Sequence, residues 1–146
     1  TDSWRVSGTV APFSRHILSR LLDEQQFDIY ATRQMRLVVE RKSDGITVGA
    51  VDMFEFDPQN LRAGVGIIIA PPYRKQGFAL DALQSLERYV RDVLRMHQLW
   101  CSVGADNEAS LALFQKAGYT ECGRRKEWLL TSNGAIDEIL MQKILK

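Results

Sequence analysis

The stretch Val65-Gly66-Ile67-Ile68-Ile69-Ala70-Pro71-Pro72-Tyr73-Arg74-Lys75-Gln76-Gly77-Phe78-Ala79 decides the fold. It opens with β-branched residues, which predict a strand over Ala63–Ala70, and two prolines end that strand. A basic loop with one glycine follows, and an amphipathic helix starts directly after it. Such a helix start presents unpaired backbone N–H groups and the positive end of the helix dipole. The sequence therefore predicts a site for phosphate groups that needs no metal.

Length and composition narrow the class of protein. The chain has 146 residues, the size of one domain with its own core, so we expect a single domain over residues 1–146. Its formal net charge is +1, which gives no general attraction to nucleic acid or to membrane surfaces. No apolar run approaches the ~18 residues that a membrane-spanning helix needs. Cys101 and Cys122 lack metal-ligand spacing, and we expect buried or half-buried free thiols, no metal and a cytoplasmic location.

Hydrophobic periodicity and turn signals give the order of elements as helix, three strands, helix, strand, helix and two strands. A strand, a crossover helix and a further strand predict one parallel pair, because such units are right-handed and parallel. We therefore expect an α/β (α+β) fold whose mixed sheet is mostly antiparallel and is flanked by helices. The expected bounds are a helix over 14–26, strands over 35–41, 47–56 and 63–70, a helix over 79–96, a strand over 99–105, a helix ending near 117, and strands over 119–131 and 136–145.

The loop excludes two common nucleotide-binding motifs. A Walker loop needs two spaced glycines and Gly-Lys-Ser/Thr, and the dinucleotide fingerprint needs three spaced glycines. The spacing Arg74-x-x-Gly77-x-Ala79 instead resembles the (Q/R)-x-x-G-x-(G/A) loop of the GNAT superfamily of N-acetyltransferases. In that family the loop holds the pyrophosphate of acetyl-coenzyme A (acetyl-CoA).

Further segments resemble the same family. Asn107–Tyr119 is similar to the pattern N-x-x-(A/S)-x-x-L-(Y/F)-x-K-x-G-(F/Y), and it stands at the expected distance after the loop. The terminal hairpin with Trp128 also agrees, so the resemblance covers nearly the whole chain. Within the family, Arg62–Ile69, Leu99-Trp100 and Asp106-Asn107 resemble the branch that holds ribosomal-protein N-terminal acetyltransferases and spermidine acetyltransferases.

The resemblance implies a cosubstrate, acetyl-CoA, and a set of residues that bind it. Backbone groups at the end of the strand would pair with the pantetheine arm, and the parallel strand pair must part there to free them. Backbone N–H groups of the loop would bind the pyrophosphate, with Arg74 supporting the loop, and Asn107 would bond to the pantetheine region. Gly77 is needed because a side chain would block close approach. The full cofactor-binding set is Ile68, Ile69, Ala70, Arg74, Lys75, Gln76, Gly77, Phe78, Ala79, Asn107 and Phe114.

The sequence departs from the family at the positions that catalyse. Many members have a tyrosine acid where this chain has Phe114, and some have a glutamate base where it has Ser102. Neither role transfers, and we expect direct attack in which proximity supplies most of the rate. A base is still needed, because an amine with a pKa near ~10 is mostly protonated at pH 7. The candidates are Glu55, which we favour, with Asp52 and Asp57, followed by Asp137 and Glu138; Tyr30, Phe54, Phe56 and Trp128 are expected to line the acceptor pocket.

The start of the chain is unusual for this family. GNAT proteins have a first strand and part of a helix before the point at which Thr1 stands, so we expect about 20 residues of the fold to be missing. The sheet would then lack its first strand, and the neighbouring edge would be uncovered or borrowed from another chain.

The sequence thus predicts an N-acetyltransferase that moves an acetyl group from acetyl-CoA to a primary amine. Two alternatives stay open: a non-catalytic acyl-CoA sensor, and an unrelated α/β module whose basic loop binds another phosphate ligand. The expected partner is a small-molecule or peptide amine, which enters from the side of Asp52–Asp57. Association with a second copy of the chain as a homodimer is also left open.

Overall fold

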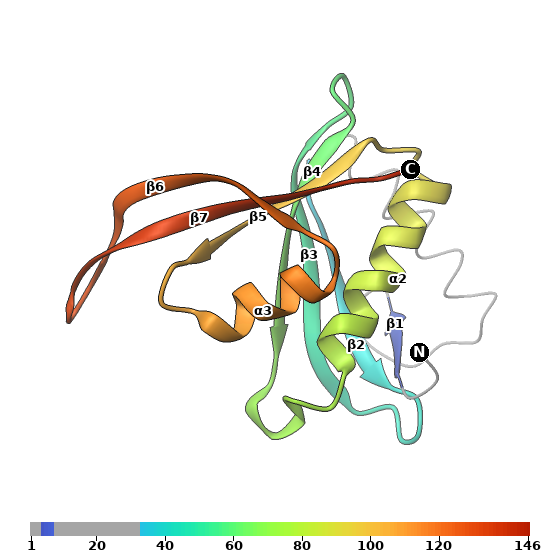
Figure 1. Cartoon of the computed structure of the whole chain (residues 1–146). Helices are drawn as coiled ribbons and strands as arrows, with labels where there is room; N and C mark the ends of the chain where they lie inside the picture. Colours follow the sequence, from blue (N-terminus) through green and yellow to red (C-terminus); the bar gives the residue numbers. More distant parts are fainter. Residues whose placement is uncertain (1–3, 8–32) are drawn as a thin grey trace.

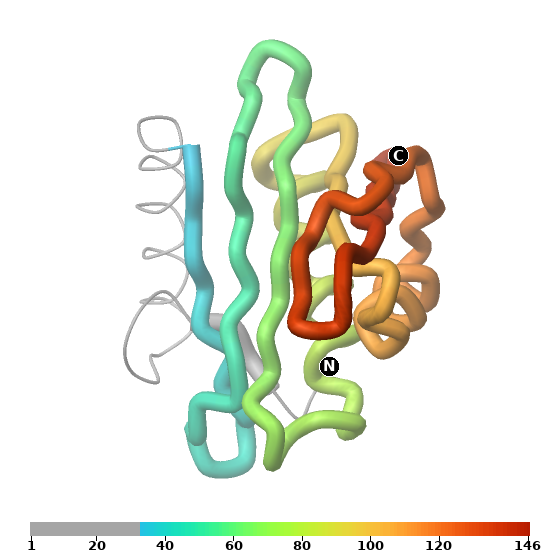
Figure 2. The backbone as a smooth tube through the Cα atoms, turned by 90° about the vertical axis from the view of Figure 1, so that its left-hand side faces the viewer, coloured from blue at the N-terminus to red at the C-terminus, as the bar shows by residue number. Residues whose placement is uncertain are grey.

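Within the described residues, seven strands form one mixed sheet in the order β1-β2-β3-β4-β5-β7-β6 (Figure 1). The computed structural model describes residues 4–7 and 33–146, so the helix expected over residues 14–26 lies outside the described residues. The strands are β1 (Trp4–Ser7), β2 (Met35–Arg41), β3 (Thr47–Asp57), β4 (Arg62–Ile69), β5 (Gln98–Gly104), β6 (Thr120–Thr131) and β7 (Gly134–Ile144). Figure 2 shows β2, β3 and β4 running side by side.

The pairing of the strands confirms the predicted fold class. β4 and β5 pair in parallel, and all other neighbouring strands pair antiparallel. The crossover between β4 and β5 contains a short 3-10 helix, η1 (Pro71–Tyr73), and helix α2 (Phe78–Asp92). Helix α3 (Glu108–Lys116) follows β5. In the parts of the chain that the structure describes, no helix combines the length and apolar character that crossing a membrane requires.

Helix α2 ends four residues earlier than the periodicity suggests. Arg95 has a positive φ of 57°, and the Met96 N–H donates to the carbonyl of Val90 over 3.1 Å. The left-handed residue and this backward bond, which spans six residues, close the helix at its C-terminal end. Leu94 and Met96 are still buried, so their apolar side chains extend the hydrophobic pattern beyond the helix itself.

The expectation that the first strand is absent is wrong for the edge of β2. Residues Trp4–Ser7 form β1, which pairs antiparallel with Val38–Arg41 of β2. The physical reason is that an open strand edge leaves unpaired N–H and C=O groups, and even a four-residue strand satisfies them.

A single hydrophobic core lies on one face of the sheet. Alternate residues of β2, β3 and β4 point into it, and helix α2 covers it with the side chains of Phe78, Ala82, Leu83, Leu86 and Val90. Cys101 of β5 is also buried there, and burial raises the pKa of its thiol to about 12. The thiol is therefore protonated at neutral pH. Cys122 is exposed, which corrects the expectation that both thiols are at least half-buried.

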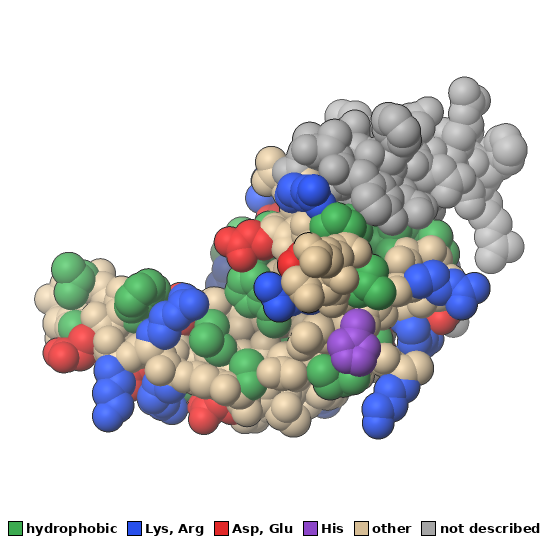
Figure 3. All heavy atoms as spheres, turned by 90° about the horizontal axis from the view of Figure 1, so that it is seen from above, with side chains coloured by type: hydrophobic (Ala, Val, Ile, Leu, Met, Phe, Trp, Pro, Cys, Tyr) green, Lys and Arg blue, Asp and Glu red, His purple; other side chains and the backbone are tan. Residues whose placement is uncertain are grey.

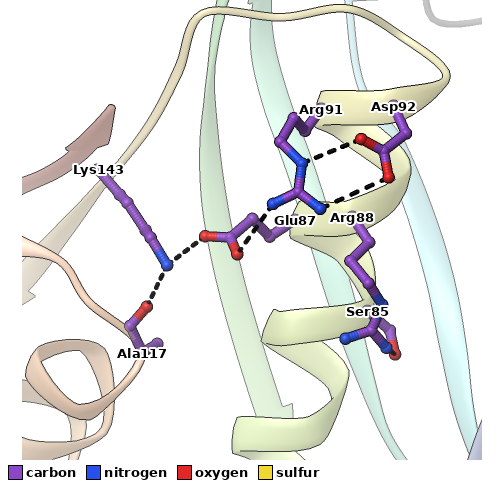
Figure 4. Close-up of polar contacts among 7 residues, drawn as sticks. All are labelled: Ser85, Glu87, Arg88, Arg91, Asp92, Ala117 and Lys143. Atoms are coloured by element: carbon purple, nitrogen blue, oxygen red, sulfur yellow. Dashed lines mark hydrogen bonds and ion pairs between the residues drawn. The ribbon is translucent and has the colours of Figure 1, made fainter. Parts of the chain in front are cut away.

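Lys143 of β7 joins the two helices to the sheet (Figure 4). Its ammonium group donates to the Ala117 carbonyl at the end of α3 over 2.7 Å, and it forms an ion pair with Glu87 of α2. Gly118 has φ +98°, and a Cβ there would lie 2.8 Å from the Lys143 Nζ. Glycine at 118 thus allows both the left-handed turn after α3 and the approach of Lys143.

We expect Lys143→Met to destabilise the protein by about 2 kcal/mol, because it leaves a carbonyl and a mostly buried carboxylate without their shared cation. Urea unfolding followed by circular dichroism measures this. Lys146→Met, which changes an exposed lysine near the same end of the chain, is the control and should change stability by less than ~0.5 kcal/mol. Equal urea midpoints for the two variants would show that the contacts of Lys143 contribute nothing to the stability of the protein.

Candidate active site

Strands β4 and β5 part partway along their length (Figure 1). Their parallel pairing covers only Arg62–Gly64 of β4 and Gln98–Trp100 of β5. Beyond this point β4 continues to Ile69 and β5 continues to Gly104, each paired only on its other side. The prediction that this pair splays is confirmed, and it leaves two inner strand edges open toward each other.

The hydrogen bonds at the end of β4 show which of its backbone groups face the opening. Ala70 lies opposite Val48 and donates its N–H to the Val48 carbonyl over 2.8 Å. In an antiparallel pair, residues alternate between bonding to the partner and pointing away from it. Counting back from Ala70, the backbone groups of Val65, Ile67 and Ile69 point away from β3 and into the opening.

This geometry corrects part of the predicted cofactor set. Both backbone groups of Ala70 are occupied, since its carbonyl also accepts the Tyr73 N–H over 2.9 Å. The backbone groups of Ile68 face β3, and its side chain is 64% exposed. Ile69 does face the opening, but its carbonyl accepts the Arg74 Nε over 2.9 Å. The backbone groups of Val65 and Ile67, which the sequence analysis did not name, face the opening instead.

The facing edge of β5 is defined in the same way. The N–H groups of Ala105 and Leu145 bond across the β5–β7 pair, each over 2.8 Å, so odd-numbered residues of β5 bond to β7. Even-numbered residues therefore face β4. The Gly104 carbonyl accepts the Asn107 N–H, so the opening receives the N–H and carbonyl of Ser102 and the N–H of Gly104.

The loop after β4 forms a concave run of N–H groups. Lys75 and Gly77 both have left-handed φ angles, 62° and 86°, and Gly77 is the N-cap of α2. Within the described part of the chain, the N–H groups of residues 75–77 have no backbone acceptor, and those of residues 78–80 precede the first intrahelical bond. Successive N–H groups in such a turn form a nest for an anion. A Cβ at Gly77 would meet nothing within 4 Å, so the space above it is open.

Side chains of the loop hold it to the strand end. The Arg74 guanidinium reaches back to Ile69, and the Gln76 amide donates to the Pro72 carbonyl over 3.2 Å. Arg74 is thus a brace, as predicted. Lys75 is exposed and adds positive charge at the rim.

Asn107 lies at the far end of β5, where it caps helix α3. Its Oδ1 accepts the Ser110 N–H over 3.2 Å. The carboxamide oxygen is therefore occupied, and the Nδ2 group is the part of the side chain that remains for a ligand.

The three candidate carboxylates differ in what they already bind. Asp52 forms a two-pronged ion pair with Arg36, with distances of 2.7 and 2.9 Å. Asp57 accepts hydrogen bonds from the side chain of Asn60 and from the N–H groups of Asn60 and Gln59, which lower the pKa of Asp57. Both therefore have structural partners. Within the described residues, no hydrogen bond or ion pair reaches the Glu55 carboxylate.

Glu55 also stands out by its backbone. It is exposed, has a positive φ of 49°, and lies in a β-bulge between Phe54 and Asp57. A bulge re-aims a side chain, and strained backbone of this kind collects at functional sites. Asp137 and Glu138, the second choices, are paired with Arg124 and Arg125 over 3.1 and 2.9 Å.

A comparison with models of protein families shows to which family the chain belongs. The acetyltransferase (GNAT) domain model matches residues 3–120. The chain belongs to the GNAT family. The loop after β4 and helix α3 carry the two sequence motifs that resemble this family.

The chain is also similar to individual members of the family. The spermidine N(1)-acetyltransferase of Escherichia coli is 32% identical over 103 residues, which are 70% of this chain and 53% of that protein. The ribosomal protein bS18-alanine N-acetyltransferase of E. coli is 34% identical over 77 residues, 51% of this chain and 50% of that protein. The chain thus spans about half the length of these curated relatives. A spermidine N-acetyltransferase from Vibrio cholerae, solved with CoA and spermine, shares the fold with a TM-score of 0.80 at 18% identity, covering 99% of this chain and 97% of that one.

Phe114 occupies the position at which many GNAT proteins have a tyrosine. Its ring is 4% exposed and meets Tyr119 edge-on, with centroids 5.0 Å apart. Tyr119 is buried too, and burial raises the pKa of its phenol, so it holds its proton. Phe114 therefore packs in the core.

We expect Phe114→Leu to lower acetyl transfer by less than tenfold, whereas loss of a true acid costs ~10²–10⁴-fold. Steady-state kinetics with the best amine acceptor checks this, with the melting temperature as a control for folding. A hundredfold fall in kcat without loss of stability would contradict the packing role.

The aromatic residues that we expected to line the acceptor pocket lie in different surroundings. Phe56 is buried in the core, and Tyr30 lies outside the described residues. Trp128 is 58% exposed on the β6–β7 hairpin, with the Arg125 guanidinium 5.0 Å from its ring centre. Figure 3 shows this hairpin standing out from the body with apolar and basic side chains on its surface. Phe54 lies opposite Gly64 of β4, beside the point at which β4 and β5 part.

Proposed function

We propose that this GNAT protein is an acetyl-CoA-dependent N-acetyltransferase whose acceptor is a primary amine. The observation that carries the proposal is that two sets of unpaired backbone groups occur at the same opening. One set lies along the inner edge of β4, and the other is the N–H nest of residues 75–80 at the start of α2. A ligand with an amide-bearing arm and a pyrophosphate matches both parts at once.

The residues present fit that ligand. The nest and the start of α2 supply N–H groups and positive potential for the pyrophosphate. Val65, Ile67 and Ser102 offer strand-like hydrogen bonds to the amides of the arm, and the Nδ2 of Asn107 offers one more donor. Acetyl-CoA supplies an activated thioester when bound. What remains for the chain is to hold the arm, orient the amine and accept a proton.

Glu55 is proposed as the group that accepts this proton. The amine nitrogen forms its bond to the acetyl carbon as the carbon–sulfur bond breaks, and the proton that the nitrogen loses passes to the carboxylate. Glu55 has no competing partner in the described structure, and its neighbour Phe54 lies against the closed end of the opening. Asp52 and Asp57 then serve to hold β2, β3 and the following turn in place.

The names of the curated relatives support a primary amine as the acceptor. The two curated relatives are named for acetylation of spermidine and of a ribosomal protein alanine, and both acceptors are primary amines. A related structure is described as dodecameric, and we propose that this chain also self-associates. Sedimentation velocity tests this second point, and a strictly monomeric protein at high concentration would contradict it.

A non-catalytic acyl-CoA sensor is the second candidate. Phe114 and Ser102 favour it, because the family resemblance places an acid and a base at these positions in other GNAT proteins. A panel of polyamines, peptides with free N-termini and aminoglycosides, incubated with acetyl-CoA, separates the two. Amine-dependent release of CoA thiol supports the transferase, whereas tight acetyl-CoA binding without release under any amine supports the sensor. Absence of CoA binding would reject both and favour another phosphate ligand.

A further inference from the structure

Phe54 and Trp100 form an aromatic pair at the point where β4 and β5 part. Their ring centroids are 5.3 Å apart, and the planes are nearly perpendicular at 88°. Phe54 lies opposite Gly64, and Gly64 and Trp100 are the last residues that pair β4 with β5. The aromatic pair therefore marks the closed end of the opening.

Glycine at position 64 allows this arrangement. A Cβ there would lie 2.2 Å from Cε2 of Phe54, and the ring extends toward Gly66, whose Cβ would be 3.8 Å from Cε1. The ring thus lies against the bare backbone of β4. Both aromatic residues are half-buried, which leaves part of their surface to meet a ligand.

On the opposite face of the sheet, which faces the core, the side chains beside this point are buried. Val65, Leu99 and Cys101 flank the same point on the core side, and each is at most 2% exposed. From the loop end at Ile69 back to Gly64 is five strand steps, roughly 17 Å at ~3.3 Å per residue. A ligand arm that starts at the loop and follows β4 therefore meets the aromatic pair at its far end.

We propose that Phe54 and Trp100 form the end wall of the acyl site and limit the length of the acyl group. This inference rests on the proposed function, in which the arm follows the inner edge of β4. A two-carbon acyl group ends before the rings, whereas a longer one meets them and can turn neither into the packed core nor past the joined strands. Phe54 and Trp100 would then be specificity residues, and the wall would favour acetyl-CoA over longer acyl-CoA molecules.

The test is calorimetric titration of CoA, acetyl-CoA and butyryl-CoA, without amine, into wild-type protein and variants. We expect wild-type protein to bind acetyl-CoA at least tenfold more tightly than butyryl-CoA. Phe54→Leu should reduce this ratio about tenfold, the scale on which apolar pockets discriminate one or two methylenes, while CoA itself binds unchanged. Trp100→Phe, a second variant, should shift the ratio in the same direction.

Met53→Val is the matched control, because Met53 is the preceding residue of β3 and points into the core instead. Its acetyl-to-butyryl ratio should equal that of the wild type. If CoA binds and the ratio is the same in Phe54→Leu, Trp100→Phe and Met53→Val, the wall is rejected while the proposed function stands. If wild-type protein binds no CoA at all, the proposed function and the wall both fail.

Discussion

Gly77→Asp is expected to weaken acetyl-CoA binding more than 100-fold while the fold is kept. The position has φ +86° and open space above it, so a carboxylate there would stand among the N–H groups that face the pyrophosphate. The carboxylate would repel the negatively charged pyrophosphate, and its side chain would prevent the close approach of the backbone. Together we expect these effects to cost more than ~2.8 kcal/mol of binding free energy. Isothermal titration calorimetry measures the affinity.

Gly134 provides the control for this change. It also has a positive φ, +114°, and a Cβ there would meet nothing within 4 Å, but it is the first residue of β7, directly after the β6–β7 turn. Gly134→Asp therefore carries the same charge change and similar backbone strain away from the nest. It should bind acetyl-CoA like the wild type. Unchanged affinity in Gly77→Asp would falsify the assignment of the loop to the pyrophosphate.

Glu55→Gln is expected to lower kcat by ~10²–10⁴-fold with little change in the KM for the amine, because the substitution removes a base and keeps the shape. The rate should recover partly at higher pH, where more of the amine is neutral without help. Steady-state kinetics from pH 6 to 10 checks both effects.

A glutamate at another bulge of the sheet supplies a matched variant. Glu127 is exposed, has φ 50° and lies on a bulge of β6, so Glu127→Gln repeats the chemistry in a similar backbone setting. It should leave the kinetics unchanged. A large loss of kcat in Asp52→Asn instead, with Glu55→Gln normal, would move the base to Asp52, despite its ion pair with Arg36.

Local patterns in the sequence were sufficient for most of the fold. Alternation and turn residues predicted the strands from Met35 onward to within a residue or two, and the Pro71-Pro72 pair predicted the end of β4. The four-residue β1 was missed, because a segment that short has no periodicity of its own. Its position depends on the open edge of β2, a property of the assembled sheet.

The site was predictable only where it depends on local backbone. The loop motif identified the nest and the brace Arg74, since a turn and a helix start are set by neighbours in sequence. The direction of backbone groups in β4 depends on its register with β3, so the sequence did not show that the groups of Ile68 and Ala70 face β3 while those of Val65 and Ile67 face the opening. Likewise, Asp52 pairs with Arg36 sixteen residues away, a contact that only the register of β2 and β3 creates.

Amide hydrogen exchange, resolved by NMR with and without acetyl-CoA, tests the central claim that the open edge of β4 receives the cosubstrate. We predict that the N–H groups of Val65, Ile67 and Ile69 exchange more slowly once acetyl-CoA is bound, together with that of Ser102. The N–H groups of Gly66 and Ile68, which already bond to β3, should change little. Saturating acetyl-CoA that leaves the exchange of Val65, Ile67 and Ile69 unaltered would contradict the account.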